Sequence, residues 1–199
     1  ADAINSYDQV GPGREFFDAT RRGAELRLNA GDTEDFQEGF RRTRANHPGQ
    51  AEQLYGLEAE LLGEIDEKEL AIEVYTEALN LFPESVSLLY GRAMTFEVLG
   101  DIAGMENDLR AILVFKPNNA TTLNALGYTL TVHTNRYEEA ADLIEKALQL
   151  SPGEPAILDS LGWVYFKLGR FLQAADLLKE AYARFPDAEV AAHLGEVLW

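Results

Sequence analysis

Prolines recur along this sequence at an almost constant spacing. Six of the seven, at positions 12, 48, 83, 117, 152 and 186, are separated by 36, 35, 34, 35 and 34 residues. From Pro48 onward, each of these prolines follows an apolar pattern of helical spacing and ends it, because proline cannot continue a helix. A fixed period of this length is typical of repeat architectures, in which one supersecondary unit recurs and stacks on its neighbours.

Each period contains two helical stretches, as the period that ends at Pro186 shows best. Its first half carries an apolar stripe at helical spacing, formed by Leu158, Leu161, Gly162 and Tyr165. Gly169 then interrupts the pattern, as glycine commonly does at the end of a helix. The second half carries a stripe of smaller residues, formed by Ala174, Leu178 and Ala181. The small residues predict that paired helices approach closely, with the large residues filling the space between them.

This order of residues resembles the tetratricopeptide repeat. From Leu158 to Pro186 it reads L-x2-L-G-x2-Y-x8-A-x3-L-x2-A-x4-P, which follows the repeat pattern nearly position for position. The resemblance implies an all-α fold, a right-handed superhelical solenoid of antiparallel helix pairs. It also implies that the first helices of successive repeats line the concave surface.

The period divides the whole chain, residues 1–199, into repeats of one solenoid. Full repeats are expected at 52–85, 86–119, 120–154 and 155–188, with a degenerate repeat at 17–51 and partial repeats at 1–16 and 189–199. The first partial repeat is expected to hold a second helix, and the last one a first helix. Within 17–51, Thr20, Gly23 and Arg27 weaken the prediction of a first helix.

The end of the sequence predicts a fragment of a longer array. Natural arrays end in polar caps, whereas Val197, Leu198 and Trp199 are apolar. We therefore expect weak homo-association through the terminal helices.

The charge of the chain excludes one class of partner and favours another. The sequence holds 17 Lys and Arg against 34 Asp and Glu, a net charge of −17, which argues against nucleic-acid binding. Residues 51–199 alone carry a net charge of −15, which favours a basic partner. The most basic run, Arg41 to Arg44, is interpreted as a solvated helix end. No apolar run approaches the roughly 18 residues of a membrane span, so direct membrane insertion is not expected.

The sequence offers no pattern of catalytic, metal or cofactor chemistry. It has no cysteine, and His47, His133 and His193 lie far apart with no metal-ligand spacing. Gly11-Pro12-Gly13 reads as a turn, since no strand precedes it and no phosphate-binding lysine follows it. We therefore predict that this chain is not an enzyme and binds no cofactor or metal.

One set of helix positions lies about 100° away from the core stripe and predicts a binding strip. Under the resemblance these positions line the concave groove, small and acidic near Glu60 and aromatic toward the C-terminal end. The predicted partner-binding residues are Tyr90, Met94, Asn124, Tyr128, Thr131, Asp159, Trp163 and Phe166.

Two interpretations of the aromatic end remain open. Trp163 and Phe166 either pack against neighbouring helices, or form an exposed patch that holds an extended peptide beside Asn124 and Asp159. The carboxylate-clamp members of the family hold a terminal carboxylate with Lys, Arg and Asn. The strip lacks those cations apart from Lys167 at its edge, so binding of that type is not expected.

Three further segments resemble the C-terminal part of bacterial envelope tetratricopeptide proteins, several of which are outer-membrane lipoproteins. These segments are residues 119–128, 159–163 and 190–196. The resemblance implies an adaptor or scaffold that binds a protein or peptide partner in the periplasm and recruits a C-terminal processing protease to its substrates. The alternatives are a regulatory region of a larger enzyme, an accessory protein of a pilus or secretion assembly, and a cytoplasmic location.

Overall fold

The computed structural model describes residues 2–199, and within them it contains helices and turns without strands. The chain divides into two compact units, one ending at Leu99 and the other running from Gly100 to Trp199. The first unit holds α1 (Asp2–Asp8), α2 (Phe16–Asn29), α3 (Thr33–Asn46), the short 3-10 helix η1 (Pro48–Gln50), α4 (Ala51–Glu64), α5 (Lys68–Leu81) and α6 (Val86–Leu99). The second holds α7 (Ile102–Phe115), α8 (Ala120–His133), α9 (Tyr137–Leu150), α10 (Pro155–Lys167), α11 (Phe171–Arg184) and α12 (Ala188–Leu198).

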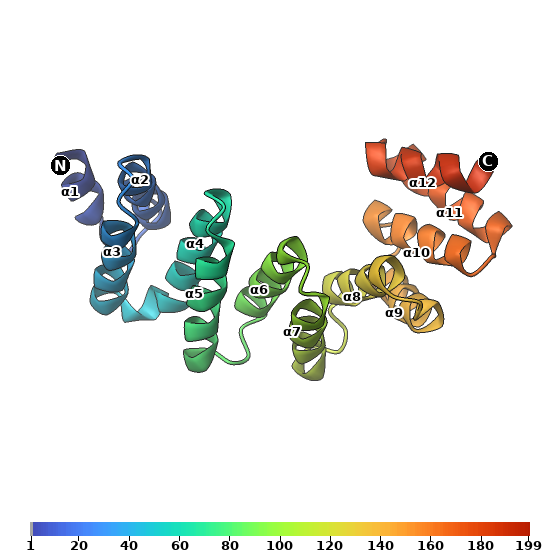
Figure 1. Ribbon diagram of the computed structural model, residues 1–199, viewed down its shortest axis with the longest axis horizontal. Coiled ribbons are helices and arrows are strands. Elements are labelled where there is room, and N and C mark those ends of the chain that lie inside the picture. The colour runs from blue at the N-terminus through green and yellow to red at the C-terminus, as the bar shows by residue number, and fades with distance from the viewer. Residues whose placement is uncertain (1) are drawn as a thin grey trace. The chain divides into compact units, whose positions relative to one another are not determined.

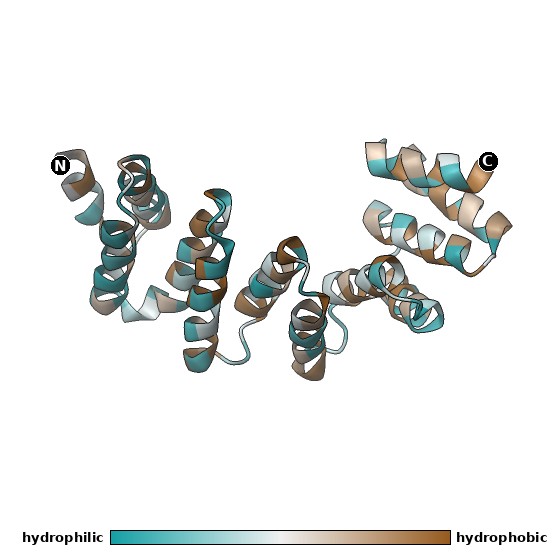
Figure 2. Cartoon of the chain, viewed as in Figure 1, coloured by the Kyte–Doolittle hydropathy of each residue, from teal (hydrophilic) through white to brown (hydrophobic). Residues whose placement is uncertain are grey.

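Short turns join consecutive helices, as the expected helix pairs require (Figure 1). The helices α3, α5, α7, α9 and α11 each end two residues before one of the periodic prolines. Several helices begin with a polar side chain that accepts a backbone N–H: Asp32 for α3, Ser85 for α6, Asp101 for α7, Asn119 for α8 and Asp187 for α12. The helices carry both hydrophobic and hydrophilic residues, so each has apolar side chains to bury against its neighbours (Figure 2). The all-α class predicted from the sequence is confirmed.

Close helix approach depends on glycine at the position predicted from the repeat pattern. In the α10–α11 pair, a Cβ atom placed on Gly162 would lie 2.6 Å from Leu178 Cγ. In the α8–α9 pair, a Cβ atom on Gly127 would lie 2.4 Å from Ile144 Cγ1 and 2.9 Å from the Ala140 carbonyl oxygen. Both distances are far below van der Waals contact, so any side chain here would push the paired helices apart.

The first helix that Thr20, Gly23 and Arg27 made doubtful within 17–51 is present in the structure as the continuous helix α2. Gly23 packs against α1, where a Cβ atom would lie 3.3 Å from Tyr7 Cβ. Arg27 is buried between two carboxylates, 2.5 Å from Asp8 Oδ2 and 3.0 Å from Asp35 Oδ2. Tertiary contacts from α1 and α3 therefore outweigh the low helix propensity of the sequence.

The basic run at the end of α3 is only partly a solvated helix end. Arg41 and Arg42 are exposed, as predicted. Arg44 is instead mostly buried; it pairs with the buried Glu58 and lies over the Tyr55 ring at 3.8 Å from the ring centre. Within residues 2–199, no helix is both long and apolar enough to cross a bilayer.

Candidate functional site

The first helices of successive pairs pack side by side within each unit. In the first unit α2 contacts α4 and α4 contacts α6; in the second unit α8 contacts α10 and α10 contacts α12. We call these two sets the first-helix layer of each unit. All eight predicted partner-binding residues lie on such helices, with Tyr90 and Met94 on α6 and the other six on α8 and α10.

An open groove of about 370 Å³ lies on the first-helix layer of the first unit, between α4 and α6. We call it the α4–α6 groove; it is lined by Ala59, Glu60, Gly63, Glu64, Lys68, Tyr75, Gly91, Met94, Thr95 and Val98. Small residues on α4 leave the space open, and Met94 from α6 borders it. Tyr90 is half-buried on the same helix, where burial and the charge of Glu97 raise the pKa of its hydroxyl.

Tyr75 reaches the groove from α5, a second helix. The predicted binding strip contains only positions of first helices, so it does not include Tyr75. Its hydroxyl lies against the α6 backbone, because a Cβ atom on Gly91 would stand only 2.4 Å from the oxygen. Burial, with the charge of Glu60 adding to it, raises the pKa of Tyr75 to about 12. The signal that could have found it is the pairing of a large Tyr75 with the small Gly91 one helix later.

Two carboxylates at the rim of the groove share one cation. Arg21 of α2 lies 2.5 Å from Glu60 Oε1 and 3.2 Å from Glu64 Oε1. The hydrogen bond to Glu60 is the main cause that raises the pKa of Arg21. All three side chains are about one third or more exposed, so the pairing contributes little to stability.

The aromatic end of the predicted strip is filled by α12. Trp163 is 8% exposed; its ring stacks on His193 of α12 with ring centres 4.2 Å apart and on Phe166 at 5.2 Å. His193 Nδ1 donates to the buried Asp159 carboxylate at 3.0 Å. The interpretation in which Trp163 and Asp159 form an exposed patch is therefore wrong, because α12 covers both side chains.

The other predicted residues of the second unit have mixed surroundings. Thr131 is buried, and its hydroxyl donates to the Gly127 carbonyl oxygen at 2.8 Å. Tyr128 is half-buried and donates to Glu189 Oε1 of α12 at 2.5 Å. Asn124 holds a buried amide oxygen without a hydrogen-bond partner, and Phe166 is half-buried. A role of any of these in partner binding stays a prediction.

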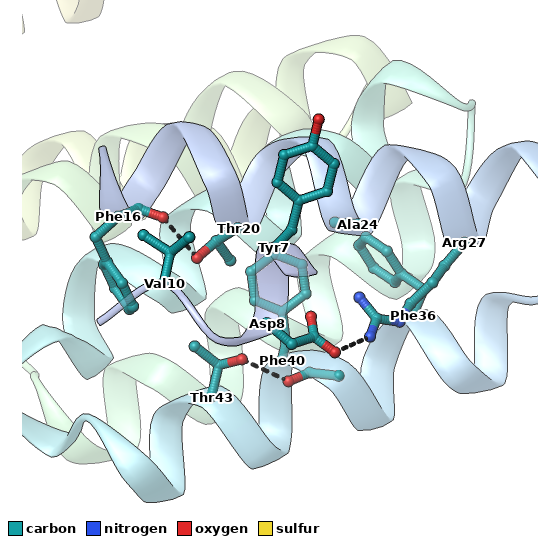
Figure 3. Close-up of a pocket in the computed structure, with 11 residues that line it drawn as sticks. Tyr7, Asp8, Val10, Phe16, Thr20, Ala24, Arg27, Phe36, Phe40 and Thr43 are labelled. Carbon is teal, nitrogen blue, oxygen red and sulfur yellow. Dashed lines mark hydrogen bonds and ion pairs between the residues drawn. The ribbon is translucent and has the colours of Figure 1, made fainter. Parts of the chain in front are cut away.

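A second hollow, among α1, α2 and α3, is part of the core rather than a binding site. It holds about 10 Å³, space for about one water molecule. Figure 3 shows Phe36, Phe40 and the paired Arg27 and Asp8 around it. Among the described residues, no group of three His, Asp or Glu side chains is arranged to hold a metal ion.

Comparison with known proteins agrees with this architecture. Two models of the tetratricopeptide repeat match the chain, one over residues 107–155 and one over 132–196. A TPR repeat-containing protein of Pseudomonas aeruginosa is 46% identical over 98% of this chain. The chain spans about a third of the length of that curated relative.

Solved structures share the fold at low sequence identity. A tetratricopeptide repeat protein from Parabacteroides merdae superposes with a TM-score of 0.74 at 15% identity, over 91% of this chain and 72% of that one. YrrB, described as a TPR protein with an unusual peptide-binding site, gives a TM-score of 0.66 at 16% identity, over 89% of this chain and 91% of its own. Residues 107–196 therefore contain tetratricopeptide repeats, and the period, the helix pairs and the P. aeruginosa relative agree with that fold along the rest of the chain.

Proposed function

We propose that this chain is a scaffold that binds a partner protein, or an extended peptide from one, on its first-helix layer and contributes no chemistry of its own. The observation that carries the proposal is the α4–α6 groove, an open and largely apolar hollow beside Met94 and Tyr75. Methionine and aromatic side chains suit such a role, because they bury a large area and adapt to a partner's shape. The peptide-binding site named for YrrB, which shares this fold, supports the same role.

Under this proposal the chain acts in the bacterial envelope, as part of an outer-membrane-anchored adaptor that brings a periplasmic processing protease to its substrates. The likeness of residues 119–128, 159–163 and 190–196 to envelope tetratricopeptide proteins supports that role. A regulatory region of a larger enzyme would instead act on its own catalytic domain. In an affinity capture, an accessory protein of a pilus or secretion assembly would retain assembly subunits. A cytoplasmic scaffold would retain cytosolic proteins.

Substituting Met94→Glu is expected to reduce partner capture from envelope extract at least about tenfold. The substitution replaces apolar lining of the groove by a charged group that a partner's apolar side chain cannot cover without a cost in desolvation. Val114→Glu is the matched control, because Val114 on α7 is 83% exposed and does not line the groove. Affinity capture with quantitative mass spectrometry, after circular dichroism shows both variants folded, measures the effect. Equal capture by the two variants would remove the groove from the function.

We also propose weak self-association through α12. Leu198 and Trp199 are largely exposed at its end, and large exposed apolar side chains favour association. Light scattering over a concentration series is expected to show a mass that rises above the monomer, and Trp199→Ser with Leu198→Ser is expected to remove the rise. A constant monomer mass at high concentration would contradict this proposal.

A further inference from the structure

The surroundings of the α4–α6 groove are strongly acidic. Residues 51–99 hold 11 acidic side chains and two basic ones, a net charge of −9. Both basic side chains are engaged: Lys68 pairs with Asp66, and Arg92 donates to Thr76 Oγ1 at 3.0 Å. The groove therefore attracts a cationic partner rather than an anionic one.

The rim of the groove already has the geometry of a guanidinium site. Glu60 and Glu64 are one helical turn apart on α4, and both contact the single guanidinium of Arg21. A guanidinium suits this arrangement, because its planar fork can donate to two carboxylates at once. Since the pairs are exposed, they are weak, and a partner's arginine can replace Arg21 without a large loss of stability. The described residues offer no third ligand for a metal ion.

An independent observation lies in the lining of the groove. The Tyr75 side chain is 7% exposed, and its hydroxyl has no hydrogen-bond partner among the described residues. The hydroxyl is not one of the enclosed unpaired atoms, which are Thr122 Oγ1 and Asn124 Oδ1, so it opens onto the groove, where an acceptor on a ligand can meet it. A tyrosine hydroxyl is protonated at neutral pH even at its ordinary pKa of about 10, and burial raises the pKa of Tyr75 further, so this hydroxyl can donate. A backbone carbonyl of an extended segment is an acceptor of the required kind.

We propose that the α4–α6 groove holds a basic segment of a partner protein, with one arginine between Glu60 and Glu64 in place of Arg21. A neighbouring apolar side chain of the segment fills the space lined by Gly63, Met94 and Val98, and a backbone carbonyl accepts from Tyr75. This inference rests on the proposed function, because it names the chemistry of the segment that the groove takes.

The test is fluorescence anisotropy of the full chain with a labelled short peptide in which two arginines flank two leucines. A peptide with glutamates in place of the arginines serves as the probe control. The arginine peptide is expected to bind, more weakly as salt increases, and the glutamate peptide is expected not to bind. Equal binding of both peptides, or no binding of the arginine peptide up to about 1 mM, the weak end of the affinity range, would overturn the proposal.

Matched variants locate the site. Glu60→Gln with Glu64→Gln is expected to weaken arginine-peptide binding about tenfold, the effect of losing roughly 1.4 kcal/mol of interaction. Glu69→Gln with Glu73→Gln removes the same charge from exposed positions of α5 that do not line the groove, and is expected to change binding less than about twofold, as long-range surface charges are screened. Equal losses in the two double variants would mean that only the general negative field matters, and the site would be wrong.

Two single variants separate this proposal from its rivals. Arg21→Ala is expected to strengthen arginine-peptide binding, because the competing guanidinium is gone; weaker binding would show that Arg21 itself holds the ligand. Tyr75→Phe removes only the hydroxyl and is expected to weaken binding several-fold, about the value of one hydrogen bond.

If Met94→Glu abolishes partner capture while Glu60→Gln with Glu64→Gln leaves capture unchanged, the groove function stands and the basic-segment proposal fails. If Met94→Glu has no effect on capture, the proposed function itself fails.

Discussion

Replacing Arg44 by methionine is expected to lower the free energy of unfolding by about 3–5 kcal/mol, the usual result of breaking a buried ion pair from one side. The Arg44 side chain is 10% exposed and its partner Glu58 only 2%. Arg44 also covers the Tyr55 ring, whose hydroxyl donates to Glu77 Oε1 at 2.6 Å. The substitution leaves the Glu58 carboxylate buried without its counter-charge. Chemical denaturation followed by circular dichroism measures the loss.

Two controls make the Arg44 prediction specific. Arg41→Met, one turn earlier on α3, removes an exposed pair with Glu38 and is expected to change stability by less than about 1 kcal/mol. Arg44→Met with Glu58→Leu removes both charges and is expected to recover most of the loss, because apolar residues can replace a buried pair. A large loss in Arg41→Met, or no recovery in the double variant, would contradict the assignment of the effect to the buried charge.

The loss of unfolding free energy in the Arg44→Met variant is also expected to depend on pH in a defined direction. Burial raises the pKa of Glu58 in the folded chain, and Arg44 opposes that shift. Without Arg44 the folded state binds the Glu58 proton still more tightly than the unfolded chain does. The deficit in unfolding free energy is therefore full above the folded pKa and shrinks as the pH falls through that pKa toward the ordinary range of glutamate. A deficit that grows on acidification would contradict this origin.

Adding a single methyl group is expected to change the stability in opposite directions at two helix glycines of the second unit. Gly127→Ala should destabilise by about 1–3 kcal/mol, since its Cβ meets Ile144 and the rigid Ala140 carbonyl. Gly195→Ala should stabilise by up to about 1 kcal/mol, because its Cβ meets nothing within 4 Å and alanine favours the helix. Thermal and chemical denaturation of both variants measure the difference. If Gly127→Ala stabilises as much as Gly195→Ala, the α8–α9 pair is not closely packed at this point.

The architecture could be read from the sequence because its signals are local. A proline at each period ends a helix whatever surrounds it, and α3, α5, α7, α9 and α11 all end two residues before one. Gly162, which lies between two large apolar residues, indicated close helix packing. The short distance from a Cβ atom placed on Gly162 to Leu178 Cγ confirms it. The placement of Tyr90, Met94, Asn124 and Trp163 on first helices followed from the same periodicity.

Which of those positions lie open was decided by tertiary structure alone. Met94 borders an open groove because α4 presents Gly63 there, whereas Trp163 is covered because α12 presents His193, 30 positions later in the chain. Arg44 departs from the predicted solvated helix end for the same reason, since Glu58 reaches it from another helix. A helical period determines the direction in which a side chain points relative to its own helix. Its exposure depends on the size and charge of side chains that only the folded chain brings beside it.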